Sequence, residues 1–190
     1  SRAEAALRRG VRGIIGAGLC VYALAATVTT PSAVRAQTAP PASTVQGTLF
    51  IVGGGPQPAA LVREFVTLAG GAGKARIVVF AMASASGRTS GEEKAQQLRS
   101  LGAQAVNVWV DRSGADAESV VQQVQEATGI WFGGGDQSRL TAALAGSRTA
   151  AAIAERYRAG AVVGGTSAGA AVMSAVMITG DERRRGGVRP

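Results

Sequence analysis

The 190-residue chain is long enough for one domain, and its 46% hydrophobic content predicts that it buries a core. Aromatic residues make up only 4% of the chain, so this core is expected to be aliphatic. The formal net charge is +8, but no stretch interleaves basic with aromatic residues, which argues against a nucleic-acid partner.

The first 36 residues have the composition and order of an export signal. Four arginines among the first twelve residues form a basic head, and the uncharged stretch GIIGAGLCVYALAATV follows at residues 13–28. Small residues at Val34 and Ala36 then suit a cleavage site after Ala36. We therefore expect export to the periplasm or the cell exterior, with membrane contact only during export. A transmembrane anchor is the alternative, but the apolar stretch is short for one.

Cysteine and histidine usage limits the chemistry. Cys20 is the only cysteine and lies inside the apolar stretch, so a chain cleaved after Ala36 would carry no disulfide. The sequence contains no histidine, and together with the lack of clustered cysteines this argues against a zinc site.

A Pro/Ser-rich linker, residues 37–46, is expected to lead into a domain that spans residues 47–190. There, short apolar runs alternate with helical patterns, which predicts an α/β fold: a three-layer, mostly parallel, doubly wound sheet. The predicted strands are Thr48–Val52, Arg76–Ala81, Ala105–Val110, Ile130–Phe132 and Ala161–Val163. The predicted helices are Pro58–Leu68, Glu92–Leu101, Ala117–Ala127 and Ser138–Ala159, the last broken near Gly146.

Three glycine-rich loops follow predicted strands: GGGPQP (53–58), GGGDQ (133–137) and GGTSAG (164–169). Ligands of such sheets bind at the carboxyl ends of the strands, so we expect these loops to converge on one site. A triple glycine leaves backbone N–H groups bare, and on this ground we assign Gly54 and Gly55 to substrate binding. A nucleotide site is the alternative, but Pro58 and Ser138 stand where G-x-G-x-x-G needs its third glycine.

Residues 165–169 read G-T-S-A-G and match the G-x-S-x-G pattern of a nucleophile elbow. Such a strand–turn–helix elbow needs small neighbours because its central residue occupies a strained, crowded turn. Ser167 is therefore a candidate nucleophile, and the N–H of Ala168 at the start of the next helix could stabilise an oxyanion. The alternative is a tight packing turn in which Ser167 only caps the helix.

The stretches GTLFIVGGG, IWFGGGDQSRL and AVVGGTSAGAAVMS, in this order and spacing, closely resemble cyanophycinases, serine peptidases related to aspartyl dipeptidase. The similarity runs from about Gly47 to the end of the chain. It implies a fold like that of class I glutamine amidotransferases, with the nucleophile on an elbow between a strand and a helix.

The resemblance also implies roles for individual residues. Ser167 would be the nucleophile, and the N–H groups of Ala168 and Gly135 would bind the oxyanion. Gln137 would help to hold the substrate, and Asp136 would orient its loop. An alternative for Asp136 and Gln137 is a capped helix start, a position that aspartate serves well.

The catalytic base is where this sequence departs from the family. The family histidine lies downstream of the serine in a segment resembling DQHF, whereas this sequence has no histidine. We therefore expect the domain to be incomplete at its C-terminus, with the base beyond Pro190, and residues 1–190 alone to be inactive. For the third catalytic member, an acidic residue, we favour Glu182 over Asp181. Either could instead pair on the surface with the neighbouring arginines 183–185.

These features predict an exported serine-type exopeptidase that cuts cyanophycin, a poly-aspartate with arginine on each side chain, into β-aspartyl-arginine dipeptides. One alternative is a dipeptidase of the same superfamily that acts on small aspartyl peptides. Another is a non-catalytic binding protein on the same scaffold. Acyl transfer of this type needs no metal or organic cofactor. Whether the protein forms a homodimer is left open.

Overall fold

The computed structural model describes residues 45–179 and 188–189. The expected export signal, the linker up to residue 44, and Glu182 with its neighbouring arginines lie outside the described residues. Within the described part, no helix combines the length and the apolar character needed to cross a membrane.

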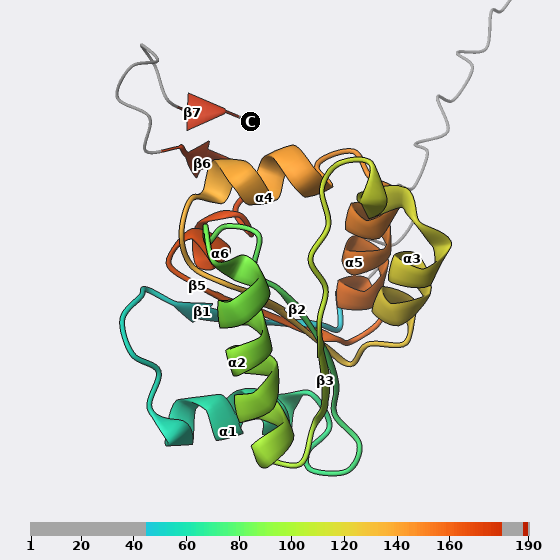
Figure 1. Cartoon of the computed structure of the whole chain (residues 1–190). Coiled ribbons are helices and arrows are strands. Elements are labelled where there is room, and N and C mark those ends of the chain that lie inside the picture. The colour runs from blue at the N-terminus through green and yellow to red at the C-terminus, as the bar shows by residue number, and fades with distance from the viewer. Residues whose placement is uncertain (1–44, 180–187, 190) are drawn as a thin grey trace, which may run out of the picture. The chain divides into compact units, whose positions relative to one another are not determined.

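Strands and helices alternate along the chain (Figure 1). The strands are β1 (Thr48–Val52), β2 (Arg76–Phe80), β3 (Gln104–Asn107), β4 (Gly129–Phe132), β5 (Val162–Thr166), β6 (Met177–Ile178) and β7 (Val188–Arg189). The helices are α1 (Ala59–Leu68), α2 (Gly87–Ser100), α3 (Glu118–Gln125), α4 (Gln137–Leu144), α5 (Arg148–Arg158) and α6 (Ala168–Ala171), with a short 3-10 helix, η1, at Gly114–Asp116. This alternation confirms the α/β fold that the hydrophobic pattern predicts.

The main sheet has five parallel strands in the order β1-β5-β4-β2-β3. β5 therefore lies between β1 and β4, although these strands are far apart in the sequence. Parallel pairing brings the loops that follow β1, β4 and β5 to the same edge of the sheet. The short strands β6 and β7 form a separate antiparallel pair.

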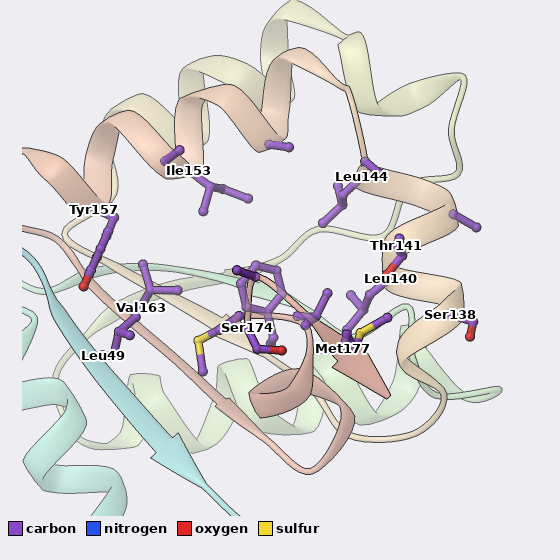
Figure 2. A pocket seen from close by; sticks show the side chains of 18 of the residues that line it. Leu49, Ser138, Leu140, Thr141, Leu144, Ile153, Tyr157, Val163, Ser174 and Met177 are labelled. Carbon is purple, nitrogen blue, oxygen red and sulfur yellow. The ribbon is translucent and has the colours of Figure 1, made fainter. Parts of the chain in front are cut away.

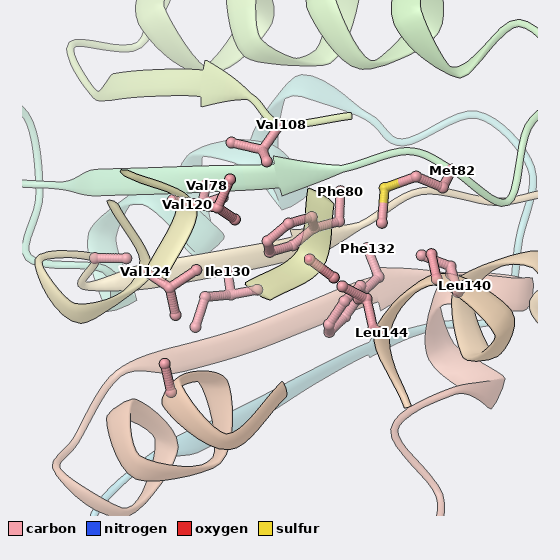
Figure 3. Packing of buried hydrophobic residues seen from close by; sticks show 14 of the residues in the cluster. Val78, Phe80, Met82, Val108, Val120, Val124, Ile130, Phe132, Leu140 and Leu144 are labelled. Carbon is pink, nitrogen blue, oxygen red and sulfur yellow. The ribbon is translucent and has the colours of Figure 1, made fainter. Parts of the chain in front are cut away.

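Helices cover both faces of the sheet because each central strand is apolar on both sides. On one face, α1 and α2 bury Phe65 and Leu98 against Ile77 and Trp131. On the other face, α3, α4, α5 and α6 cover a second cluster, in which Phe80 and Phe132 stack with ring centroids 5.8 Å apart (Figure 3). Successive residues of β2 thus alternate between the two cores, as a pleated strand requires.

The structure corrects the predicted ends of several elements. β5 was predicted to end at Val163 but continues to Thr166, because Gly164 and Gly165 pair with Phe50 and Ile51 of β1. Glycine disfavours strands, so local sequence alone signals an earlier end. The pairing with β1 outweighs that local preference.

α2 begins at Gly87, five residues before the predicted start at Glu92. A Cβ atom at Gly87 would lie 2.2 Å from the carbonyl oxygen of Ala81, so this turn of the helix packs closely on the end of β2. β3 ends at Asn107 rather than Val110, and the Asn107 amide donates to the carbonyl of Arg88 at 3.0 Å. The serines and glycines at residues 84–91 have the composition of a loop, which hid the helix start.

Candidate active site

β5 leads through Ser167 directly into α6, the strand–turn–helix arrangement expected of a nucleophile elbow. Ser167 has φ 53° and ψ −116°, and among the described residues it is the one non-glycine residue with positive φ. Such a conformation costs about 1–3 kcal/mol and persists only where its surroundings enforce it.

Three backbone hydrogen bonds hold the strained turn in place. The Ser167 N–H donates to the carbonyl of Val52 at 2.9 Å, and the Ser167 carbonyl accepts from the N–H groups of Ala170 and Ala171 at 2.9 and 3.0 Å. The backbone is therefore fixed on both sides while the side chain stays exposed. Among the described residues, none hydrogen-bonds the Ser167 hydroxyl.

The glycines of the G-x-S-x-G motif are required by close packing. A Cβ atom at Gly165 would lie 2.3 Å from the carbonyl oxygen of Gly169. One at Gly169 would lie 2.2 Å from the carbonyl oxygen of Phe132, in the neighbouring strand β4. Both distances are far below van der Waals contact, so neither position accepts a larger residue without a backbone shift.

The two triple-glycine loops flank the serine from opposite sides. A Cβ atom built on Gly54 would lie 3.6 Å from the Ser167 Cβ and 4.0 Å from its Oγ. One built on Gly134 would lie 3.5 Å from the Ser167 Cβ. The three glycine-rich loops therefore meet at Ser167. Because the flanking loops carry no side chains there, a substrate has room beside the serine.

The proposed oxyanion donors lie in well-fixed segments. Ala168 is buried and is the first residue of α6, so its N–H has no acceptor within that helix. Gly135 is held close to the segment after β2, where the N–H of Asp136 donates to the carbonyl of Ala83 at 2.9 Å. Among the described residues, none accepts a hydrogen bond from the Gly135 N–H.

Asp136 and Gln137 make the contacts of a helix start. The Asp136 carboxylate accepts from the N–H of Ser138 at 2.8 Å and so caps α4. The Gln137 amide donates to the carbonyl of Ile178 in β6 at 2.6 Å. The capping alternative therefore describes Asp136 in this structure, and Gln137 would have to release Ile178 before its amide could bind a substrate.

A hydrogen-bond network near the elbow joins Gln57, Lys94 and Thr166, which no sequence motif singles out. The Gln57 amide donates to the Gly55 carbonyl at 2.6 Å and to the Thr166 hydroxyl at 3.2 Å. The Gln57 carbonyl oxygen accepts from the Lys94 ammonium at 2.9 Å. Helix α2, the loop after β1 and the residue before Ser167 are thereby connected.

Lys94 is a partly buried lysine with a shifted pKa. Burial lowers the pKa of its ammonium from the ordinary lysine value. Its place in the sequence gives a signal, because Gly91, Lys94, Ala95 and Leu98 have the i, i+3, i+4, i+7 spacing of one helix face. Gly91, Ala95 and Leu98 are buried, so this face of α2 packs on the sheet. Lys94 lies on the same face and is therefore partly buried as well.

A large cavity of about 860 Å³ does not contain the serine. It is mainly apolar and lies between α4, α5 and the segment that follows α6. Figure 2 shows Leu144 and Ile153 pointing from these helices toward Val163 and Leu49 of the sheet. Neither Ser167 nor Gln137 lines it, so this cavity is separate from the elbow chemistry. Among the described residues, no cluster of His, Cys, Asp and Glu side chains is placed to hold a metal ion.

The sequence profile of peptidase family S51 matches residues 49–188, which include Ser167 and both triple-glycine loops. The chain belongs to peptidase family S51. The resemblance to cyanophycinases is also confirmed. The cyanophycinase of Nostoc sp. (strain PCC 7120 / SAG 25.82 / UTEX 2576) is 34% identical over 123 residues, which are 63% of this chain and 41% of that relative.

Two other family comparisons agree with this assignment. The cyanophycinase of Synechococcus elongatus is 36% identical over 84 residues, covering 43% of this chain and 26% of the relative. The crystal structure of a peptidase from an acI-B1 Actinobacterium is similar with a TM-score of 0.59 at 25% identity, covering 70% of this chain and 60% of that one. The chain thus spans less than half the length of the curated relatives it matches.

Proposed function

We propose that this protein is a serine-type exopeptidase that hydrolyses cyanophycin to β-aspartyl-arginine dipeptides through an acyl-enzyme on Ser167. The observation that carries the proposal is the strained, exposed Ser167 held by three backbone hydrogen bonds between two bare glycine loops. Membership of a peptidase family and the cyanophycinase relatives support the reaction class and the substrate.

In the first step, the Ser167 Oγ attacks the scissile carbonyl carbon while a general base takes the hydroxyl proton. The carbonyl oxygen becomes an oxyanion, which the N–H groups of Ala168 and Gly135 stabilise. The tetrahedral intermediate then collapses: the C–N bond breaks, the amine leaves with the proton from the base, and an ester on Ser167 remains. Water attacks this ester with the same base, which releases the carboxylic acid and restores the hydroxyl.

The general base is a group that the described residues do not provide. This sequence contains no histidine, and Glu182, our candidate for the acidic member, lies outside the described residues. We therefore assign no general base among the described residues. Activity is therefore tested in the protein expressed from its complete reading frame.

The decisive experiment compares that protein with its Ser167→Ala variant on two substrates, insoluble cyanophycin and soluble aspartyl dipeptides. Removing the nucleophile is expected to lower turnover by at least about 1000-fold, and mass spectrometry should find an acyl adduct on Ser167 in the active protein. Ser119→Ala, an exposed serine of α3, is the matched control and should keep full activity.

The same experiment separates the alternatives. Clearing of insoluble polymer supports the cyanophycin substrate, whereas turnover confined to dipeptides would make the protein an aspartyl dipeptidase. Saturable binding without any turnover by the complete protein would contradict catalysis and support a binding protein. Unchanged hydrolysis by Ser167→Ala would overturn the assignment of the nucleophile.

We also propose that the protein is exported, since the basic head and apolar stretch of residues 1–36 have the order of a signal peptide. N-terminal sequencing of the protein purified from its native cell should then begin at Gln37. A mature protein that retains residues 1–36 in the cytoplasm would contradict export.

A further inference from the structure

A second, smaller hollow lies on the α2 side of the sheet, beside the elbow. Its volume is about 180 Å³, which suits a group of a few heavy atoms. Apolar walls come from β2 and β4, chiefly Trp131, and polar groups come from Ser84, Ser90, Lys94 and Thr166. It is distinct from the large apolar cavity between α4, α5 and the segment that follows α6, with which it shares no lining residue.

The hollow reaches the residues that surround the nucleophile. Thr166 precedes Ser167 in the chain, and Gly134, which faces the Ser167 Cβ, also lines the hollow. A group bound there would therefore sit next to the scissile bond of a substrate at Ser167.

Of the residues that the structure describes, Lys94 is the one charged residue that lines this hollow. Its ammonium donates to the side-chain carbonyls of Gln57 at 2.9 Å and Gln97 at 2.7 Å, and it lies 5.0 Å from the centre of the Trp131 ring. Two of its three donors are thus used, both on neutral amides. No carboxylate of the described residues forms an ion pair with it.

A half-buried ammonium without a counter-ion is unfavourable, because burial removes water that no opposite charge replaces. An anion in the hollow would supply that charge and could accept the third N–H of Lys94. The hydroxyls of Ser84 and Thr166 are further donors at the wall, whereas the Ser90 hydroxyl already donates to the Ser86 carbonyl at 3.1 Å. Since the hollow holds a single positive charge, it matches a monoanionic carboxylate better than a dianionic phosphate.

We propose that this hollow is a carboxylate subsite, in which Lys94 binds a free carboxylate of the peptide substrate while Ser167 attacks the neighbouring carbonyl. The inference rests on the proposed function for its role in hydrolysis. Its ligand chemistry, a small carboxylate beside the elbow, stands on Lys94 and the hollow alone. Lys94 is then a specificity-determining residue of the site.

The hydrogen bonds of Gln57 connect Lys94 to the residues around the elbow. The same Gln57 side chain accepts from Lys94 and donates to the Thr166 hydroxyl and the Gly55 carbonyl. A carboxylate that draws the ammonium toward the hollow changes the bond to Gln57, and with it the support of the loop after β1.

The direct test is a binding measurement by NMR, with the lysines of the full protein labelled at ¹³Cε. This sequence has two lysines, Lys74 and Lys94, and Lys74→Met and Lys94→Met assign their signals. Lys74 is exposed in the turn before β2, at the opposite end of that strand, and is the matched control. The ligands are the monoanionic α-amide of N-acetylaspartate, its neutral analogue, the α-amide of N-acetylasparagine, and inorganic phosphate.

The α-amide of N-acetylaspartate is expected to shift the Lys94 signal saturably and to raise the pKa of Lys94, because a bound anion stabilises the ammonium. Lys74 should not respond, the neutral α-amide of N-acetylasparagine should cause no more than a tenth of the shift at equal concentration, and phosphate should bind more weakly than the carboxylate. Equal shifts at both lysines, no saturation, or a preference for phosphate would each overturn the carboxylate subsite.

The kinetic counterpart uses the complete active protein. Lys94→Met is expected to raise KM about 10–100-fold for a substrate with a free carboxylate, and to change KM for the matching amide substrate by a much smaller factor. Lys94→Arg, which retains the charge, should restore part of the loss. Equal effects of Lys94→Met on both substrates would overturn the subsite. A protein that shows no turnover but a saturable NMR shift of Lys94 would instead overturn the proposed function, and the subsite would still hold.

Discussion

The two triple-glycine segments of this protein, residues 53–55 after β1 and residues 133–135 after β4, have the same three letters but different surroundings. A Cβ atom on Gly135 would lie 2.2 Å from the carbonyl oxygen of Ala83, and one on Gly133 would lie 3.2 Å from the Cα of Ala81. In the first segment, Gly53 and Gly55 have nothing within 4 Å of such an atom. Packing thus requires glycine at residue 135 in the second segment, whereas in the first segment the positive φ of Gly54 and Gly55 is what favours glycine.

The positions of the strands explain the difference. β4 lies inside the sheet between β5 and β2, so the loop after it packs on the chain that follows β2. β1 is an edge strand of the described sheet, where Leu49 and Ile51 are 44% and 67% exposed. The same three glycines therefore form a tightly packed wall of the site after β4 and a loosely packed wall after β1.

Replacing Gly135 by alanine should have the largest effect on stability. The new Cβ would clash with the Ala83 carbonyl, and φ at this position is +138°. We expect the free energy of unfolding to fall by about 3 kcal/mol or more, measured by urea denaturation. A loss below 1 kcal/mol would show that the loop after β4 can move away and would remove the contrast between the segments.

Gly55→Ala tests the other segment, where only the backbone is unfavourable. With φ at +74° and open space around it, alanine should cost about 1–2 kcal/mol in the same measurement. Gly146→Ala, at φ +69° and also in open space, should cost a similar amount, whereas Gly53→Ala, which has neither strain nor clash, should be nearly neutral. A loss at Gly55 as large as that at Gly135 would contradict the distinction.

The cap that ends the second segment should contribute less. Asp136→Ala removes the acceptor of the Ser138 N–H and should lower the stability of the protein by about 1 kcal/mol. Asp136→Asn keeps a capping oxygen and should recover most of this loss. If both variants lose activity without losing stability, Asp136 acts on the substrate rather than as a cap.

The smallest effect is expected where a side chain supports the first segment. Gln57→Leu removes the bonds to the Gly55 carbonyl and to Thr166, and should lower stability by about 0.5–1 kcal/mol. Gln97→Leu is the control, since Gln97 also accepts from Lys94 but forms no hydrogen bond with residues 53–57. Hydrogen exchange of the amides at residues 53–57 should increase for Gln57→Leu alone, and an equal increase for both variants would rule out a specific role of Gln57 in the loop.

Much of the fold was predictable from residue patterns. Apolar runs of strand length and the helical spacing between them located every strand and α-helix from residue 48 to residue 163 to within a few residues, except for the start of α2, and did not predict the 3-10 helix η1. The start of α2 was hidden because serine and glycine at residues 84–91 are typical of a loop; close approaches to Ala81 and Asn107 explain the glycines at 87 and 91. The far end of β5 was missed because glycines disfavour strands in isolation and are held there by β1.

The candidate site was predictable only in part, for a related reason. The G-x-S-x-G pattern identifies Ser167 from neighbouring residues, because the small residues that the turn requires, Gly165 and Gly169, stand two positions before and after it. The local signal for Lys94 is weaker: it shares the helical spacing of Gly91, Ala95 and Leu98, but a lone lysine in a helix is most often solvated. Its importance comes from neighbours 37 residues away in the sequence, such as Gln57.

The sequence by itself determined the alternation of strands and helices, the sharp turn at Ser167 and the glycines that this turn needs, because these depend on residues close together in the chain. Only the tertiary structure decided the strand order β1-β5-β4-β2-β3, and with it which triple glycine is packed and which lysine faces the elbow. The physical reason is that periodicity shows which face of a strand is buried but not which strand lies beside it, since that choice depends on long-range packing.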